Sequence, residues 1–280
     1  MNIGILEYQD YHKVYTHTLE EISSNHNVYI YFNIKDALGS TDKLDLLFVN
    51  TIRPLPWDMY KWFRFKPKCK TILTTHEINT DFKTMRFIIK KFDAISVPLK
   101  TMKEQIEKKF NGKIFTLPFM LHEKVYPNTN NMIVVPGKIE DFRRDYSIIF
   151  KNMLKSEHWC FLGEPIGIYG HKVMLECINR NDYGYNIKYF SSFVPKKLYE
   201  DILKGSKIIY APLKNPTKGH NGLFKEYYGK TKACGAMFEA IKYGKTFKSN
   251  LDIKVDYKDY LVKDWIKYFE KEIIEGFVNE

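Results

Sequence analysis

The stretch Glu226–Thr246 reads EYYGKTKACGAMFEAIKYGKT and is the most informative segment of the chain. Gly229 can adopt a positive φ angle and bring the backbone close to a ligand. Lys230 and Lys232 add two ammonium groups beside it. A helix expected over Lys232–Tyr243 has unpaired N–H groups and the positive end of its dipole at its start. A glycine turn, two cations and a helix N-terminus together predict an anion-binding site.

Two further residues of this stretch extend the predicted site. Gly235 leaves room for a diphosphate to touch the backbone, and Glu239 stands one helical turn further on, where a carboxylate can bridge two ribose hydroxyls. The stretch is not a GxxxxGK[ST] phosphate loop, because Phe224 stands where that pattern requires glycine. A solvated basic turn in front of an ordinary helix is the alternative interpretation.

Outward from this stretch, short apolar runs alternate with helical patterns along the whole chain, which predicts βαβ crossovers and parallel sheets. In the first half we expect strands at Asn2–Leu6, Val28–Phe32, Leu44–Val49, Lys70–Thr75, Ala94–Val97 and Lys113–Leu117, and helices at Val14–Ile22, Trp57–Phe63, Asp81–Lys91 and Lys100–Phe110. In the second half we expect strands at Met132–Val135, Trp159–Leu162, Ile187–Phe190 and Lys207–Ala211, and helices at Tyr146–Leu154, Lys172–Asn179, Pro195–Leu203 and Lys232–Tyr243.

The polar cluster PNTNN (Pro127–Asn131) separates the two halves and is typical of a linker. The sequence therefore predicts an α/β protein with two Rossmann-like domains facing each other across a cleft, followed by C-terminal helices. The expected boundaries are 1–125 for the first domain, 126–131 for the linker, 132–256 for the second domain and 257–280 for an amphipathic helical tail. In such sheets, ligands bind at the carboxyl ends of the strands.

The net charge of +11 fits a nucleic acid, an anionic membrane surface or a polyphosphate-bearing small ligand as partner, or simply a well-solvated surface. No helix-turn-helix, zinc-finger or RNP signature is present, so a nucleic acid is not expected. The basic run FIIKKF (Phe87–Phe92) and the lysine-rich tail leave both a solvated helix face and contact with an anionic membrane open.

The chain has no apolar window of about 18 residues that could span a bilayer. Its start, MNIGILEYQDY, lacks the pattern of a secretion signal. The four cysteines are scattered without a CxxC pair, so neither a zinc site nor a disulfide framework is expected. We therefore expect a cytoplasmic protein, with the periphery of a membrane as a further location.

The run YYGKTKACGAMFEAIKYGK resembles the donor-binding segment of retaining, nucleotide-sugar-dependent glycosyltransferases of the GT-B fold, the large glycosyltransferase family 4 group. In that family a loop and helix carry small residues under the donor diphosphate and a glutamate on the ribose. The resemblance implies donor contacts for Tyr228, Gly229, Thr231, Lys232, Gly235 and Glu239.

Three other segments carry the same resemblance. VVPGKIEDFRRDY (Val134–Tyr146) resembles the opening of the family's C-terminal domain, which assigns a donor-binding loop to Gly137 and phosphate contacts to Arg143 and Arg144. WCFLG resembles the next strand with its terminal Gly163, and IIYAPL (Ile208–Leu213) resembles the strand before the donor loop. The first half matches in its alternation alone, as an acceptor domain would.

The resemblance implies transfer of a sugar from a nucleotide-diphosphate sugar, with retention and without a tightly bound metal or other cofactor. We expect Arg144 and Lys230 to stabilise the leaving diphosphate. His76, at the end of a strand in TTHEIN, is a candidate to orient or deprotonate the acceptor, with a structural histidine as the alternative. His220 lies in the mobile-looking loop KGHNGLF and is a candidate donor contact. The acceptor (a glycan, a lipid-linked molecule or a protein) is not identified.

One position departs from the family pattern. The family carries two glutamates in this helix, and Lys232 stands at the position of the first, whereas Glu239 matches the second. This departure leaves a nucleotide-sugar epimerase of the same fold as an alternative activity. A basic nucleic-acid-binding protein is the remaining alternative, and it rests on charge alone.

Overall fold

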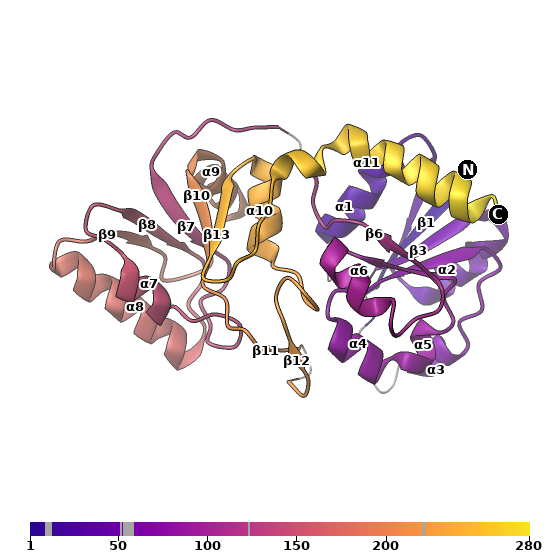
Figure 1. The fold of residues 1–280 in the computed structure, drawn as a ribbon, viewed down its shortest axis with the longest axis horizontal. Helices are drawn as coiled ribbons and strands as arrows, with labels where there is room; N and C mark the ends of the chain where they lie inside the picture. The colour runs from indigo at the N-terminus through magenta and orange to yellow at the C-terminus, as the bar shows by residue number, and fades with distance from the viewer. Residues whose placement is uncertain (9–12, 51, 53–58, 123, 220–221) are drawn as a thin grey trace. The chain divides into compact units, whose positions relative to one another are not determined.

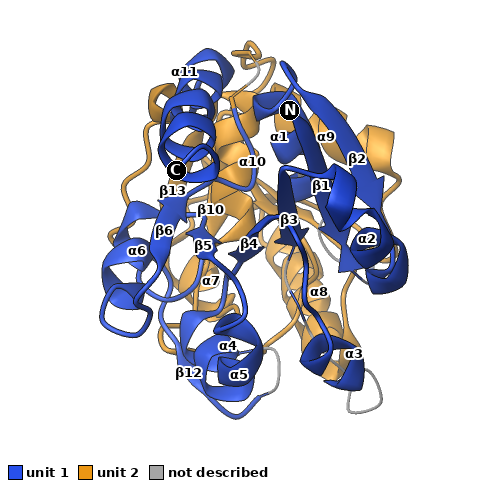
Figure 2. Cartoon of the chain, turned by 90° about the vertical axis from the view of Figure 1, so that its right-hand side faces the viewer, with its two compact units in different colours: residues 1–121, 219–233, 260–280 blue, residues 122–218, 234–259 orange. Residues whose placement is uncertain are grey.

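The computed structural model describes the chain except residues 9–12, 51, 53–58, 123 and 220–221. The described residues form two compact units (Figure 2). Unit 1 consists of Met1–Leu121, Gly219–Ala233 and Tyr260–Glu280. Unit 2 consists of His122–Lys218 and Cys234–Asp259. The chain thus leaves unit 2 before the glycine turn of the most informative stretch and re-enters it at the start of the following helix.

Unit 1 is built on a six-stranded sheet with the order β2-β1-β3-β4-β5-β6, and all its neighbouring strands are parallel (Figure 2). The strands are β1 (Asn2–Glu7), β2 (Asn27–Tyr31), β3 (Leu46–Asn50), β4 (Lys70–Thr74), β5 (Ala94–Val97) and β6 (Lys113–Thr116). Every residue of β3, LLFVN, is buried. A central parallel strand reads as continuously apolar because helices cover both faces of the sheet.

The connections of unit 1 are mostly short helices. They are α1 (Lys13–Ile22), α2 (Ile34–Ser40), the 3-10 helix η2 (Thr41–Lys43), α3 (Met59–Phe63), α4 (Ile78–Thr84), α5 (Arg86–Ile89) and α6 (Lys100–Ile106). Helix α2 was not expected from the sequence, although it has a good start signal. The Asn33 side chain accepts a hydrogen bond from the Asp36 N–H at 2.9 Å, which is the usual N-cap arrangement.

Unit 2 has a five-stranded parallel sheet with the order β13-β10-β7-β8-β9. Its strands are β7 (Met132–Pro136), β8 (His158–Leu162), β9 (Asn186–Tyr189), β10 (Ile208–Ala211) and β13 (Thr246–Ser249), and its helices are α7 (Ser147–Asn152), α8 (Gly167–Asp182), α9 (Lys196–Gly205) and α10 (Gly235–Tyr243). Two parallel sheets flanked by helices confirm the predicted α/β class with two Rossmann-like domains.

Several predicted helices have different bounds in the structure. The predicted helix Asp81–Lys91 is two helices, α4 and α5, because Met85 leaves the helical region at φ −122° and ψ 19°. The helices at Lys100–Phe110 and Tyr146–Leu154 are shorter than predicted, the helix at Lys172–Asn179 is longer, and strand β13 was missed. Helix α10 begins at Gly235 rather than at Lys232, because Lys232 pairs with Glu77 as an antiparallel β-bridge.

The C-terminal tail packs onto unit 1. After the 3-10 helix η4 (Tyr257–Tyr260) it forms α11 (Val262–Tyr268) and the π-helix η5 (Phe269–Val278) (Figure 1). Phe269 and Phe277 join the hydrophobic core of unit 1, and the Phe269 ring lies 6.1 Å from the Phe48 ring of β3. The predicted amphipathic tail is therefore helical, and its apolar side is buried by unit 1.

Candidate functional site

Two loops meet at the carboxyl end of the unit 2 sheet, where β7 and β8 end. Gly137 follows β7 with φ +90°, a conformation that favours glycine. Gly163 follows β8, and a Cβ at Gly163 would lie 2.0 Å from the Gly137 carbonyl oxygen. The two predicted glycines therefore allow a close backbone approach of the two loops. This edge is where ligands bind in open parallel sheets.

Arg144 lies at the same loop. Its guanidinium donates a hydrogen bond to the Pro136 carbonyl oxygen at the end of β7. A Cβ at Gly137 would come within 2.9 Å of Arg144 Nη2, so the glycine makes room for the guanidinium. Arg144 is half-buried, which places a permanent positive charge where water screens it only in part.

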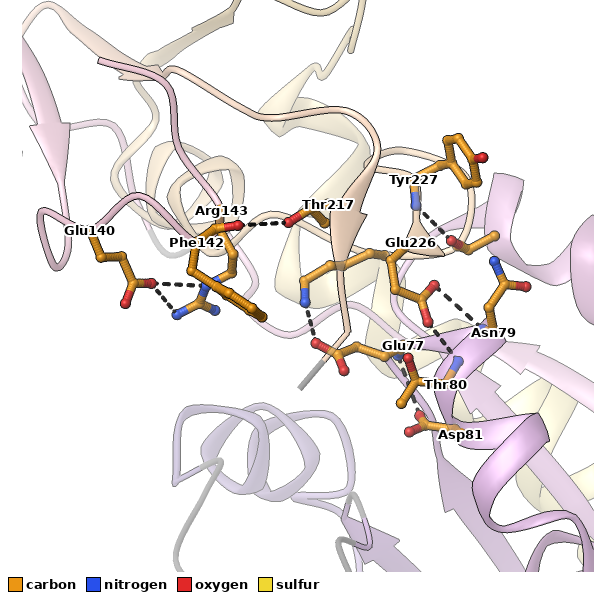
Figure 3. Close-up of polar contacts among 12 residues, drawn as sticks. Glu77, Asn79, Thr80, Asp81, Glu140, Phe142, Arg143, Thr217, Glu226 and Tyr227 are labelled. Atoms are coloured by element: carbon orange, nitrogen blue, oxygen red, sulfur yellow. Dashed lines mark hydrogen bonds and ion pairs between the residues drawn. The ribbon is translucent and has the colours of Figure 1, made fainter. Parts of the chain in front are cut away.

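Arg143 behaves differently from its neighbour. Its side chain is exposed and forms a pair with Glu140, with Nε 3.1 Å and Nη2 2.9 Å from Glu140 Oε1 (Figure 3). An exposed pair of this kind contributes little to stability or to binding. Of the two arginines considered from the sequence, the structure thus gives Arg144 the better position for an anion.

Helix α10 starts at Gly235, directly after Cys234, and no side chain caps it. A Cβ added to Gly235 would meet no atom within 4 Å, so the first turn opens to space. Burial raises the pKa of the Cys234 thiol, while the Arg144 guanidinium and the N–H groups of Met237 and Ala236 act in the opposite direction. The charge of Arg144 and the helix N-terminus therefore act on the same point.

Glu239 lies one turn into α10 and is half-buried. The Tyr199 hydroxyl of α9 donates a hydrogen bond to Glu239 Oε1 at 2.7 Å. Burial raises the pKa of Glu239 to about 7, although the Tyr199 hydrogen bond and the Arg144 charge both favour the ionised form. Burial also raises the pKa of the Tyr199 hydroxyl, so this group stays a donor. Glu239 is therefore a carboxylate that changes charge near neutral pH.

The glycine turn before α10 belongs to unit 1. Gly229 adopts the expected positive φ, +77°, and its carbonyl oxygen accepts a hydrogen bond from Thr101 Oγ1 at 2.5 Å. The Ile78 N–H donates to the Thr231 carbonyl oxygen at 2.9 Å. Hydrogen bonds from a backbone N–H of α4 and a side-chain hydroxyl of α6 thus tie the backbone of this turn to unit 1.

Lys232 is the buried cation of the turn. It is 4% exposed, and its ammonium forms an ion pair with Glu77, which is 2% exposed. Both residues lie in unit 1. Glu77 stands between β4 and α4, and Lys232 stands in the turn before α10. A buried ion pair of this kind holds its two segments together, because either charge alone would be costly to bury.

Glu226 attaches the same segment to unit 1 at a second point. It is the last residue of the short strand β12 (Lys225–Glu226), which pairs with β11 (Thr217–Lys218). Fully buried, it accepts hydrogen bonds from the Thr80 N–H at 2.6 Å and the Asn79 N–H at 3.4 Å (Figure 3). These N–H groups belong to the first turn of α4, where a carboxylate is also attracted to the positive end of the helix dipole. Glu226 therefore anchors the segment to α4.

The remaining predicted site residues also fall in unit 1. Lys230 is exposed and forms no ion pair with any residue that the structure describes. Tyr228 is buried, and His76 is 8% exposed with its ring edge-on to Phe119 at 5.9 Å. His220 lies outside the described residues. Unit 2 thus brings together Gly137, Gly163, Arg144, Gly235 and Glu239, whereas unit 1 holds Tyr228, Gly229, Lys230, Thr231, Lys232 and His76.

Sequence reasoning missed two polar features. Tyr199 has no motif of its own, and it is forty residues from Glu239 in the chain. At the carboxyl edge of the unit 1 sheet, Thr16 links Glu7 Oε2 at 2.6 Å and the Asn50 amide at 2.8 Å, all buried. Glu7 and Asn50 end β1 and β3, so polar residues closing two apolar strands were the available signal.

Metal-binding clusters and membrane-spanning segments were sought over the same residues. Within the described ranges, no group of three or more His, Cys, Asp or Glu side chains is placed to hold a metal ion. None of the helices described here combines the length and apolar character needed to cross a bilayer.

Comparison with known proteins gives matches at the level of three-dimensional structure. No protein-family model matches the sequence, and no curated protein matches it either. AviGT4, a glycosyltransferase involved in avilamycin A biosynthesis, has a similar structure with a TM-score of 0.55 and 8% identity, over 97% of this chain and 88% of that chain. An E. coli structure described as trehalose-6-phosphate bound with UDP-2-fluoro glucose matches with a TM-score of 0.54 and 7% identity, over 100% of this chain and 92% of that one.

At these identities the likeness concerns the fold. The chain has the GT-B fold, the two-domain α/β architecture of nucleotide-sugar glycosyltransferases, as the resemblance of its second half implied. Both matches extend over nearly the whole chain, so the first half shares the fold as well.

Proposed function

We propose that this chain is a glycosyltransferase that moves a sugar from a nucleotide-diphosphate sugar to an acceptor. The observation that carries the proposal is the cluster in unit 2, where Arg144 and the open first turn of α10 lie at the carboxyl edge of a parallel sheet. Glu239 stands one turn further along the same helix. A guanidinium and a helix N-terminus suit a diphosphate, and the carboxylate suits a ribose diol.

In the proposed mechanism the main task of the protein is to stabilise charge. When the glycosidic bond to the donor phosphate breaks, negative charge grows on the leaving nucleoside diphosphate. Preorganised donors at that point lower the barrier, because they need not reorient during the reaction. Arg144 and the α10 N–H groups supply this stabilisation in unit 2. The donor contact of Lys230, which lies in unit 1, stays a prediction from the sequence. This arrangement needs no bound metal, and the proposal includes retention of the anomeric configuration.

We assign acceptor binding to the carboxyl edge of the unit 1 sheet. Glu7, Asn50 and His76 end or follow strands there and are buried polar groups. His76 is the candidate that orients the acceptor hydroxyl or accepts its proton. The acceptor itself, whether a glycan, a lipid-linked molecule or a protein, is left to a screen.

The first experiment is a thermal-shift screen against nucleoside diphosphates and their sugars. A ligand that binds the folded protein stabilises it, by about 2.7 kcal/mol when its concentration is 100 times Kd. The best donor is then incubated with candidate acceptors, and the products are followed by proton NMR with and without EDTA. Transfer with an unchanged anomeric configuration and no effect of EDTA supports the full proposal. A donor that is converted only to its epimer would point to the epimerase instead.

The position of the diphosphate is tested by Gly235→Ala. A new Cβ meets no atom in the structure, so the fold should be kept or slightly stabilised. We expect binding of the nucleotide sugar to weaken about tenfold, because the methyl group occupies space that the diphosphate needs. Gly39→Ala in α2 is the matched control, since a Cβ there also meets nothing within 4 Å. Equal binding by both variants, measured by calorimetry, would contradict this placement.

The role of Glu239 is tested by the pH dependence of binding. With a pKa of about 7, Glu239 is mostly neutral at pH 6 and mostly ionised at pH 8. Because the ionised form accepts both ribose hydroxyls, we expect the affinity for UDP-glucose to rise about tenfold between these pH values. A nucleotide sugar is the right probe, since its diphosphate has no ionisation in this range.

Two variants identify the titrating group in that experiment. Glu239→Gln should bind more weakly and with a flat pH profile. Tyr199→Phe removes a hydrogen bond that favours the ionised carboxylate, so the midpoint should move to higher pH. A profile that stays unchanged in Glu239→Gln would assign the titration to another group.

A further inference from the structure

Unit 1 exposes three large apolar side chains on helices α3 and α5. The exposed fractions are 55% for Tyr60, 51% for Phe63 and 76% for Phe87. Single exposed apolar residues are common on protein surfaces, whereas a group of rings on one surface marks a contact site.

Helices α3 and α5 lie at the same end of unit 1 (Figures 1 and 2). The Lys91 ammonium, just after α5, donates a hydrogen bond to the Phe63 carbonyl oxygen at the end of α3. Beneath them, the rings of Phe65 and Phe92 pack with their centroids 5.3 Å apart. A hydrogen bond and a buried ring contact therefore join the segments at the C-terminal ends of the two helices.

The same surface is strongly basic. Residues 59–68 contain four Lys or Arg and no acidic residue, and residues 82–92 likewise contain four and none. Lys83, Arg86 and Lys90 are exposed, and none forms an ion pair with a residue that the structure describes. We call the surface made of Tyr60, Phe63, Lys83, Arg86, Phe87 and Lys90 the basic–aromatic face.

The acidic groups that the structure describes around this face are buried or bonded to other residues. Asp81 of α4 is 1% exposed. Asp93 follows α5 and accepts hydrogen bonds from the Thr71 N–H and hydroxyl, both at 2.8 Å. Asp42 pairs with Lys68, at 2.8 Å. The Lys83 ammonium lies over the Phe224 ring, 4.7 Å from its centroid, and no described carboxylate pairs with it, with Arg86 or with Lys90. The positive charge of the face is therefore available to an external anionic partner.

We propose that the basic–aromatic face rests on the headgroup region of an anionic lipid bilayer. Aromatic rings favour the boundary between headgroups and acyl chains, and lysines and arginines beside them are attracted to anionic lipids. The rings project from short helices rather than from the flat sheet on which single-stranded nucleic acids usually stack. The proposed contact is peripheral and stands independently of glycosyl transfer.

The first experiment is sedimentation of the full chain with phospholipid vesicles. We expect binding to vesicles of phosphatidylcholine with about 30% phosphatidylglycerol, and little binding to phosphatidylcholine alone. Binding should weaken between 0.1 M and 0.5 M NaCl, because salt screens the attraction. Equal binding to both kinds of vesicle, or no binding to either, would overturn the proposal.

Charge-removal variants test the location of the contact. Lys83→Gln, Arg86→Gln and Lys90→Gln combined should lower the partition coefficient on the order of a hundredfold, about fivefold for each cation. The matched control combines Lys151→Gln, Lys172→Gln and Lys197→Gln, three exposed lysines of unit 2. If both triple variants lose the same amount of vesicle binding, the vesicles attract the protein through its net charge alone. That outcome would contradict a contact at the basic–aromatic face.

Insertion of the face is tested with a reporter. Phe87→Trp should retain binding, and its fluorescence should be quenched by lipids brominated along the acyl chains, beyond the quenching of the native tryptophans. Phe87→Ser should weaken binding about tenfold, and melting curves check that both variants fold. Absence of additional quenching, or release of the protein from vesicles by a short RNA at equimolar phosphate, would assign the face to a partner other than a bilayer.

Discussion

Arg144→Ala should weaken binding of the nucleotide sugar and lower kcat/KM by about a hundredfold or more. The reason is the position of the guanidinium, which is half-buried at the Gly137 loop and acts on the start of α10. Removing it takes away a charge that is only partly screened by water. In the proposed mechanism this charge is the main stabilisation of the leaving diphosphate. Calorimetry measures the binding, and initial rates with the best donor measure the activity.

Arg143→Ala is the matched control, because it deletes the same side chain one residue earlier. Arg143 is exposed and already paired with Glu140, so we expect less than a threefold change. Arg144→Lys separates charge from geometry, since lysine keeps the charge and loses the planar fork. Because Arg144 also bonds the Pro136 carbonyl, the melting temperature is recorded for each variant. If a well-folded Arg144→Ala protein binds the donor as tightly as the unchanged protein, the assignment of the diphosphate to this site is wrong.

Lys232→Met should destabilise unit 1 by about 3–5 kcal/mol, because it leaves the Glu77 carboxylate buried without its main countercharge. Glu77→Gln should also destabilise, and the double variant should recover most of the loss, since it removes both charges. Unfolding of a two-unit chain need not be two-state. Hydrogen exchange of the β4 and α4 amides therefore gives the appropriate measurement.

Lys230→Met is the control for Lys232→Met, two residues away in the same turn. Lys230 is exposed and makes no ion pair with the described residues, so its replacement should change stability by about 0.5 kcal/mol or less. Calorimetry with the same variant tests the separate sequence-based prediction that Lys230 contacts the donor. A Lys232→Met protein as stable as Lys230→Met would show that the buried pair does not anchor the turn.

The Lys232–Glu77 pair also bears on the departure of this chain from the family pattern. In the resemblance to glycosyltransferase family 4, Lys232 stands at the position of the first glutamate of the donor helix. That difference is the reason why an epimerase is an alternative activity. In the structure Lys232 precedes α10 and is paired within unit 1. The lysine thus has a structural partner within unit 1. The product analysis by NMR distinguishes the two activities.

The sequence by itself determined the α/β class, the two parallel sheets and the local chemistry of single loops. These follow from local patterns: apolar strands alternate with helices, and Gly229 adopts the expected positive φ angle. Such features depend on neighbouring residues and on backbone sterics, so they can be read from short windows.

Only the tertiary structure decided which unit holds each segment and which side chains meet. Lys232 and Glu77 are separated by 155 positions in the chain, and Tyr199 and Glu239 by 40. The turn before α10 and the C-terminal tail both pack onto unit 1, through a buried ion pair and a buried apolar face. Contacts between distant residues form because burying a charge or a ring requires a specific partner, and no local pattern identifies that partner.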